Sequence, residues 1–165
     1  MEEFNLSLKI SPSDSQFKKT LGEEKYQKLK AKVLEANENK CCGCGYKPLD
    51  EKRASSILNL HVITINEENL EESECNCLCK ACHTTQHIDV ALNMGWVQLV
   101  NSTFSQKTLI EMCRINSVYN SIQENNIRHL TKTPEEFLEK LRAGTLPAPD
   151  KSKVIFTSKF EWGDL

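Results

Sequence analysis

The sequence predicts an α+β fold organised around a bound metal ion. Two Cys-x-x-Cys pairs, Cys41 with Cys44 and Cys79 with Cys82, stand in the middle of the 165-residue chain. A run rich in β-branched residues, 57–65, lies between the pairs and is typical of a strand. Segments with helical periodicity precede and follow the pairs. Together these observations indicate helices and a small sheet arranged around paired cysteines.

The amino-terminal part is expected to hold a short strand and an amphipathic helix. Apolar and polar residues alternate over residues 4–10, which predicts a half-buried strand that ends before Pro12. Over residues 22–37, apolar side chains recur every three or four positions, which predicts a helix. Its lysines are expected to form a solvated outer face: Lys25, Lys28, Lys30 and Lys32.

Further elements are predicted after the central strand. Residues 66–74 are rich in glutamate and are expected to form an exposed acidic loop. A helix that follows the second cysteine pair should end at Gly95, and residues 96–100 should form a strand. Ser105 can cap a helix, and a capping box predicts another helix over residues 133–144. The helix after Ser105 carries an apolar stripe assigned to the core: Leu109, Met112, Cys113, Tyr119 and Ile122.

Composition and charge narrow the function classes. The chain carries 21 Lys and Arg against 23 Asp and Glu, so its formal charge is -2 and no global positive field gathers nucleic acid. The amino-terminal residues lack the pattern of a signal peptide, and no run of about 18 apolar residues occurs. We therefore expect a soluble, cytoplasmic protein without membrane insertion, for which nucleic acid is not the expected partner.

The cysteines indicate a structural metal site. Eight cysteines in a chain without an export signal favour metal binding over a disulfide framework. The Cys-x-x-Cys spacing lets two thiolates bind one ion while amides of the turn point at the sulfurs. Four thiolates leave no open coordination position, so the ion should hold structure rather than activate water. We predict one structural Zn²⁺ per chain with four ligands: Cys41, Cys44, Cys79 and Cys82.

The order of the predicted elements matches a treble-clef zinc module. The first cysteine knuckle is followed by a hairpin, and the second runs directly into a helix that delivers the second ligand pair. The fold class is therefore α+β, a treble clef with a small β-hairpin and accessory helices. The exact ligand set stays open, because other candidates lie in the same segments: Cys42, Cys75, Cys77 and His83. Of these, Cys77 is the preferred substitute.

Three segments resemble the HNH endonucleases, which are a treble-clef family. They are CCGC at 41–44, LNLHV at 58–62 and LCKACH at 78–83. The resemblance implies a metal ligand beside a catalytic histidine on the strand, and further metal ligands on the helix. We expect a zinc-stabilised HNH-like domain with accessory helices over residues 1–144, and a linker with an apolar tail over 145–165.

The histidines match the HNH pattern incompletely. The strand supplies His61 alone, preceded by Leu60, so either the base or the strand ligand is missing. Glu74 stands where the family has an asparagine. His83 and His87 lie one helical turn apart and could join His61 in a second metal site. Exposed or hydrogen-bonded helix histidines are the alternative interpretation. We therefore assign no catalytic residue.

A narrower resemblance is to the DotN (IcmJ) family of Dot/Icm type IV secretion coupling complexes, whose members are degenerate HNH-like proteins. It rests on LSLKISPS at 6–13, the helix entering CCGCGY at 41–46, the second cysteine knuckle, and FSQKTLIEMCRI at 104–115. The resemblance implies a zinc-stabilised subunit that docks onto a protein partner such as a coupling ATPase. The acidic loop at 66–74 departs from that family's pattern.

The sequence thus predicts a non-catalytic, zinc-stabilised protein-interaction subunit or adaptor, of a type IV secretion coupling complex in the narrower interpretation. One alternative is a divergent HNH endonuclease that uses His61, His83 and His87. Another is a phage or plasmid factor that binds and blocks a host protein.

The carboxy-terminal tail from Val154 to Trp162 is rich in aromatic and aliphatic residues. It should either contribute to the partner surface or fold back onto its own domain as a sheet edge.

Overall fold

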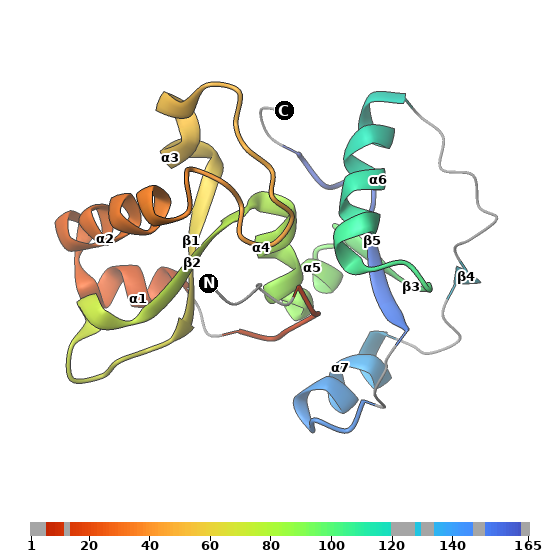
Figure 1. The fold of residues 1–165 in the computed structure, drawn as a ribbon. Helices are drawn as coiled ribbons and strands as arrows, with labels where there is room; N and C mark the ends of the chain where they lie inside the picture. Colours follow the sequence, from red (N-terminus) through yellow and green to blue (C-terminus); the bar gives the residue numbers. More distant parts are fainter. Residues whose placement is uncertain (1–5, 12–13, 120–127, 130–133, 147–150, 163–165) are drawn as a thin grey trace. The chain divides into compact units, whose positions relative to one another are not determined.

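The computed structural model describes residues 6–11, 14–119, 128–129, 134–146 and 151–162, and it combines helices with short antiparallel sheets (Figure 1). The described chain divides into two compact units. The first holds Ser11–His83, and the second holds Leu6–Ile10 together with Thr84–Trp162. The carboxy-terminal strand belongs to the second unit.

The first unit consists of helices and one two-stranded sheet. Its elements are α1 (Asp14–Leu21), α2 (Glu23–Ala36), the 3₁₀ helix η1 (Glu51–Arg53), α3 (Ala54–Ile57), β1 (Leu58–Thr64), the 3₁₀ helix η2 (Leu70–Glu72), β2 (Glu74–Cys79) and the beginning of α4 (Lys80–Gln86). Strands β1 and β2 pair antiparallel, with Leu58 opposite Cys79 and His61 opposite Asn76. The register shifts between Val62 and Thr64, which indicates a bulge.

Helix α1 was not predicted, although its sequence carries a helical signal. Phe17 and Leu21 are four positions apart and both are buried, so they anchor one face of the helix. Gly22 separates α1 from α2 with a φ of 86°, a conformation that side-chain-bearing residues rarely adopt. The predicted helix over 22–37 is confirmed as α2.

The expected solvated lysine face of α2 is wrong at one position. Lys30 is 9% exposed, and its Nζ donates a hydrogen bond of 2.7 Å to the Ser55 carbonyl oxygen. Burial lowers the pKa of Lys30. The lysine lies on the side of α2 that packs against α3, which the periodicity of α2 alone could not reveal. In contrast, Lys25 and Lys28 are exposed.

The strand predicted over 57–65 is confirmed as β1, whose apolar residues Leu58 and Leu60 are buried. The residues that lead into the second cysteine knuckle form strand β2, which ends at Cys79. The acidic loop begins with a compact turn, because the Asn66 Oδ1 accepts hydrogen bonds from two following amides. Thus the loop is locally ordered at its start rather than being uniformly extended.

The second unit is built on a three-stranded antiparallel sheet with strand order β4-β3-β5. After the end of α4 come α5 (Ile88–Asn93), β3 (Val97–Asn101), α6 (Gln106–Tyr119), β4 (Arg128–His129), α7 (Pro134–Arg142) and β5 (Ser152–Phe156). Its apolar core cluster consists of Leu8, Ile88, Ala91, Val97, Leu99, Phe137, Leu138 and Val154.

The strand predicted over residues 4–10 is not present in its described part. Ile10 forms a single antiparallel bridge with His87, and the Lys9 amide donates to the Thr85 carbonyl oxygen. The Ile88 amide donates in turn to the Lys9 carbonyl oxygen. This segment therefore pairs with the junction between α4 and α5 and not with a strand. Leu8 is nevertheless buried, as the alternation predicted.

Other predicted helix ends agree with the structure. The helix after the second cysteine pair is interrupted at His87 and ends before Gly95, whose φ is 68°. The Ser105 Oγ accepts a hydrogen bond from the Thr108 amide and so caps α6. Along α6, Leu109 and Cys113 are buried as predicted. The Tyr119 side chain, Ile122 and the Thr133 cap lie outside the described residues.

The carboxy-terminal tail folds back as a sheet edge. Strand β5 pairs with β3, and Val154 is fully buried between its neighbours. The Gln106 side chain donates to the Val154 carbonyl oxygen and accepts from the Val154 amide, both at 2.9 Å. Phe156, Phe160 and Trp162 then pack their rings together at centroid distances of 4.4–5.1 Å. The tail is thus part of the second unit.

The helices in the described parts of the chain are too short or too polar to cross a membrane.

Candidate metal centre

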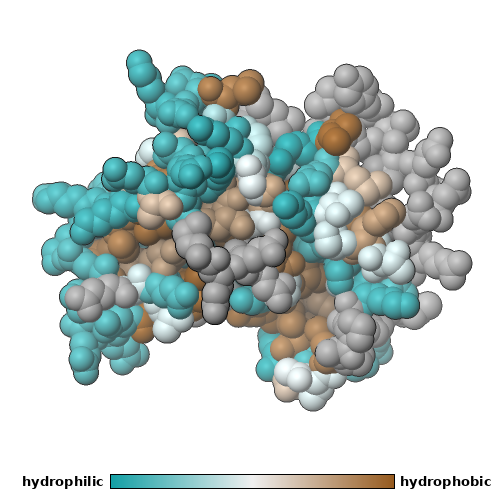
Figure 2. Space-filling view, viewed as in Figure 1, coloured by the Kyte–Doolittle hydropathy of each residue, from teal (hydrophilic) through white to brown (hydrophobic). Residues whose placement is uncertain are grey.

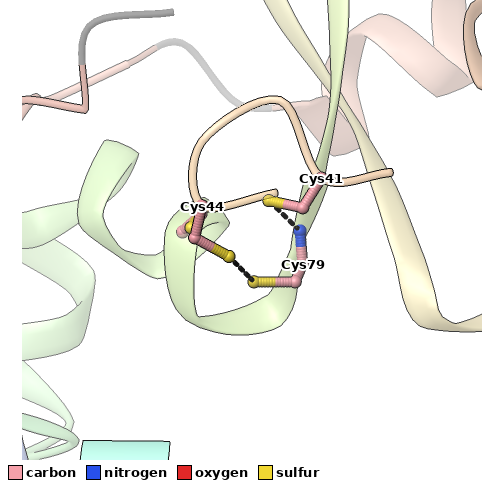
Figure 3. A group of neighbouring side chains, drawn as sticks. Cys41, Cys44 and Cys79 are labelled. Atoms are coloured by element: carbon pink, nitrogen blue, oxygen red, sulfur yellow. Dashed lines mark hydrogen bonds between the residues drawn. The ribbon is translucent and has the colours of Figure 1, made fainter. Parts of the chain in front are cut away.

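Four cysteines of the first unit converge as a metal-binding group. Their sulfurs all lie within 4.8 Å of one another, and the four residues are Cys41, Cys44, Cys79 and Cys82. Figure 3 shows Cys41 and Cys44 on a loop that faces Cys79 at the end of β2. The Cys44 and Cys79 sulfurs are 3.8 Å apart, and the Cys79 amide donates to the Cys41 sulfur at 3.2 Å. The structure therefore brings together the ligand set predicted from the sequence.

Local backbone structure explains how the first pair is presented. The Gly45 amide donates to the Cys41 carbonyl oxygen, and the Cys41 amide donates to the Tyr46 carbonyl oxygen. These bonds close a tight loop in which Gly45 has a φ of 77°. The second pair lies where β2 passes into α4, so Cys79 ends a strand and Cys82 occupies the first turn of a helix.

Electrostatics in the group favour a cation. All four side chains are nearly inaccessible, with exposures from 0% for Cys82 to 7% for Cys44. Hydrogen bonding from the neighbouring thiols and burial raise the pKa of Cys82 and of Cys79. For Cys41, the raising effect of Cys44 is outweighed by hydrogen bonds with Cys79 and Cys82, and the pKa is lowered. Four buried thiols therefore cannot all ionise unless a positive ion compensates their charge.

The other cysteines of these segments lie outside this group. The Cys42 amide donates to the Cys77 carbonyl oxygen at 2.8 Å, which ties the knuckle loop to β2 through the backbone. Burial is the main cause that raises the pKa of both Cys75 and Cys77 to about 12. Cys113 is buried in α6 of the second unit, as expected for a small apolar core residue.

A second group of possible ligands consists of Asp14, His61, His83 and His87. The first three belong to the first unit. The Asp14 Oδ2 is 3.1 Å from the His61 Nδ1 and 2.6 Å from the His83 Nε2. The two imidazole rings are 5.5 Å apart between centroids and nearly perpendicular, at 83°. The other carboxylate oxygen, Asp14 Oδ1, accepts the Val62 amide hydrogen at 3.0 Å.

Burial distinguishes the members of this second cluster. His61 on β1 is 2% exposed, whereas the side chain of His83 on α4 is 26% exposed. The Asp14 side chain, in the first turn of α1, is 13% exposed. Solvent therefore reaches the cluster mainly beside His83.

Sequence analysis named the three histidines of this group but missed Asp14. The aspartate is 47 positions from His61 and 69 from His83, so local pattern does not connect them. The available signal was an acidic residue after Pro12 at the start of an amphipathic turn. His87, the third histidine considered, belongs to the second unit and precedes α5.

Two positions that bear on the HNH resemblance are also described. Leu60, which precedes His61 on the strand, is 1% exposed and belongs to the core of the first unit. Glu74, which occupies the asparagine position, begins β2 and accepts a hydrogen bond from the Thr64 hydroxyl at 3.2 Å.

Comparison of the chain with family models, with curated proteins and with solved structures finds no match.

Proposed function

We propose that the four-cysteine group holds one structural zinc ion, and that the segment from Cys41 to His83 is an HNH-like treble clef. Four buried thiols within 4.8 Å of one another suit the tetrahedral thiolate coordination of zinc. The order of knuckle loop, β1–β2 hairpin and α4 supports the treble clef. One zinc equivalent, measured by elemental analysis and lost in Cys82→Ser, is the expected result.

We further propose that this module does not catalyse and instead serves as a protein-interaction subunit or adaptor. The observation that carries the proposal is the burial of His61, the histidine at the position of the catalytic base. A general base must come within hydrogen-bond reach of the substrate or of its attacking water. His61 is 2% exposed and lies against the Asp14 carboxylate, so its ring is poorly accessible to a phosphodiester.

Surface charge supports an adaptor rather than a nucleic-acid enzyme. Exposed lysines of the first unit form ion pairs with nearby glutamates: Lys18 with Glu23, Lys25 with Glu71, Lys28 with Glu24, Lys40 with Glu38, and Lys47 with Glu51. Each such pair contributes little to stability, but it balances charge that a phosphate backbone would otherwise attract. Figure 2 shows largely hydrophilic side chains over α2 and α3.

Exposed apolar residues of the first unit favour a protein partner. Leu49 is 99% exposed in the loop between the first knuckle and η1, and Ile63 and Ile65 are exposed at the far end of β1. Single exposed apolar residues are common, but a leucine that makes almost no contact with its own chain is a reasonable anchor for a partner. In the narrower interpretation the partner is the coupling ATPase of a type IV secretion complex.

The interaction is tested by placing a photoreactive amino acid at Leu49 and crosslinking in the native host. A control protein carries the same group at Lys52, which is also exposed. We expect one dominant crosslinked protein from Leu49 and little of it from Lys52. Equal or absent crosslinking from both positions would argue against this surface.

Nuclease activity is the second candidate, favoured by the closeness of His61 and His83 and by the partial exposure of His83. In that reaction His61 would take a proton from water, the water oxygen would bond to phosphorus, and the P–O ester bond would break as the leaving oxygen gains a proton. A bound divalent cation would stabilise the charge on the phosphate.

A plasmid-nicking assay with Mg²⁺, Mn²⁺, Ni²⁺ or Zn²⁺ separates the two candidates. We expect no nicking by the unmodified protein. General-base catalysis contributes about 100-fold to 10,000-fold in rate. Nicking that falls by that factor in His61→Ala would therefore establish the nuclease and overturn the non-catalytic proposal.

A further inference from the structure

We propose that Asp14, His61 and His83 form a second divalent-cation site, which is structural and separate from the four-cysteine group. The three ligands come from α1, β1 and α4, so a bound ion would fasten the amino-terminal helix to the hairpin and to the following helix. This inference does not depend on the adaptor function.

The three ligand atoms are already close enough to share one ion. The Asp14 Oδ2 lies 3.1 Å from the His61 Nδ1 and 2.6 Å from the His83 Nε2, and all ligand atoms of the cluster lie within 4.8 Å of one another. An ion at about 2.0–2.2 Å from each of three such atoms requires them to stand roughly 3–3.5 Å apart. Only a small separation of the histidines from the carboxylate is therefore needed.

The surroundings hold the carboxylate in position for this role. The Asp14 Oδ1 accepts the Val62 amide hydrogen at 3.0 Å, which orients the Oδ2 toward the two histidines. Supporting hydrogen bonds of this kind orient metal ligands and raise the affinity of a site. The helix carrying Asp14 is itself anchored, because Phe17 and Leu21 are buried. Thus the free energy needed to arrange the ligands is largely supplied by folding.

The donor set selects the class of ion. Two imidazole nitrogens and one carboxylate oxygen suit Zn²⁺, Ni²⁺, Co²⁺ and related transition ions. Mg²⁺ and Ca²⁺ prefer sites made of oxygen ligands. We therefore expect a transition ion at this cluster.

This site differs from the one that the HNH resemblance implies. The HNH resemblance implies a metal ligand next to the catalytic histidine on the strand. In this chain the residue before His61 is Leu60, which is 1% exposed and cannot bind a metal. Asp14 reaches the cluster from a helix that precedes the whole cysteine module. In addition, His61 is buried as one of the three ligands and is not presented to a substrate. The site therefore suits a structural ion rather than a catalytic one.

The test uses the full chain as purified with its thiolate-bound metal, and Ni²⁺ is added in a calorimetric titration. The thiolate charge-transfer absorption is followed at the same time, so that exchange at the cysteines would be seen. Asp14→Asn is the matched variant, because the amide oxygen can still accept the Val62 amide hydrogen while the charge is lost. His83→Gln removes a second ligand, and Glu68→Gln in the exposed acidic loop is the control.

We expect one additional Ni²⁺ equivalent in the unmodified protein and in Glu68→Gln, without change in the thiolate absorption. Loss of a group that only supports a metal ligand lowers the affinity for the metal by roughly 10- to 100-fold. Asp14→Asn and His83→Gln remove the ligands themselves, so each should weaken Ni²⁺ binding by at least that factor. Hydrogen exchange of the α1 amides should slow on adding Ni²⁺ to the unmodified protein. Absence of the additional equivalent, or Asp14→Asn affinity equal to that of the unmodified protein, would overturn the proposal.

Discussion

Loss of one cysteine ligand should unfold the first unit while leaving the second largely intact. The perturbation is Cys82→Ser, which removes a fully buried thiol from the four-cysteine group. Cys42→Ser is the matched control, because Cys42 lies next to a ligand but outside the group, and it is only half buried. The two variants make the same chemical change in neighbouring parts of the structure.

The expected size of the effect follows from the hairpin. Ordering the seven residues of β1 and the six of β2 costs about 13–26 kcal/mol in backbone entropy. Burial of Leu58, Leu60 and Leu78, each 0–1% exposed, returns about 5–9 kcal/mol. The remaining deficit is roughly 4–21 kcal/mol, which is of the same order as the contribution of a structural zinc, about 10–16 kcal/mol. An isolated two-stranded hairpin is marginal in water for the same reason.

The second unit should respond differently. Its core cluster contains none of the four cysteines, and its sheet joins three strands, of which β5 packs against α6. Hydrogen exchange followed by mass spectrometry can resolve the two units. In Cys82→Ser, the β1 and β2 amides should exchange rapidly, whereas those of β3 and β5 should remain protected.

Two results would refute this reasoning. Unchanged protection of β1 and β2 in Cys82→Ser would show that the hairpin is stable without the complete ligand set. Equal damage from Cys42→Ser and Cys82→Ser would show that burial of a thiol, rather than metal coordination, determines the stability. Chelator treatment of the unmodified protein should reproduce the pattern of Cys82→Ser.

Three further predictions concern other contacts. Deleting the chain from Lys151 onward should lower the melting temperature of the second unit, because β5 and the fully buried Val154 are lost; an unchanged melting temperature would contradict this assignment. Gln106→Leu should cost about 2–6 kcal/mol in unfolding free energy, because two buried backbone groups of Val154 lose their partners; a denaturant midpoint equal to that of the unmodified protein would be inconsistent with it. Burial and then the Asp14 charge raise the pKa of Tyr26 to about 12, above its usual value near 10. The unfolded state therefore ionises first, so stability present below pH 10 should fall as the pH rises toward 12, and Tyr26→Phe should reduce this loss.

The sequence was informative where the chemistry is local. A Cys-x-x-Cys pair needs one tight loop, and Gly45 permits the positive φ that closes it, so spacing alone located the metal group. Strand β1 and helix α6 were predicted for the same reason, because alternation, helical periodicity and the Ser105 cap are all short-range properties. These features fix the conformation of a segment before the rest of the chain has folded.

The sequence was uninformative where distant segments meet. Lys30 has the spacing of a solvent-facing residue, and only the packing of α2 against α3 makes it buried. The alternation of residues 4–10 correctly predicted burial of Leu8 but could not show that its neighbour would be a helix junction. A pattern therefore predicted which side chains are buried better than it predicted what they pack against.

Asp14 shows how much functional meaning depends on one such distant contact. The residues around His61 in the sequence do not show whether a carboxylate from elsewhere in the chain covers its ring. The sequence alone therefore cannot separate a buried His61 from an accessible one. In the folded first unit, the Asp14 carboxylate holds both His61 and the Val62 amide, and the imidazole is 2% exposed. A buried histidine held by a carboxylate can bind an ion or hold a proton, and a substrate reaches it less readily than an exposed one. The contact between α1 and β1, rather than the sequence around the histidine, therefore determines how accessible His61 is.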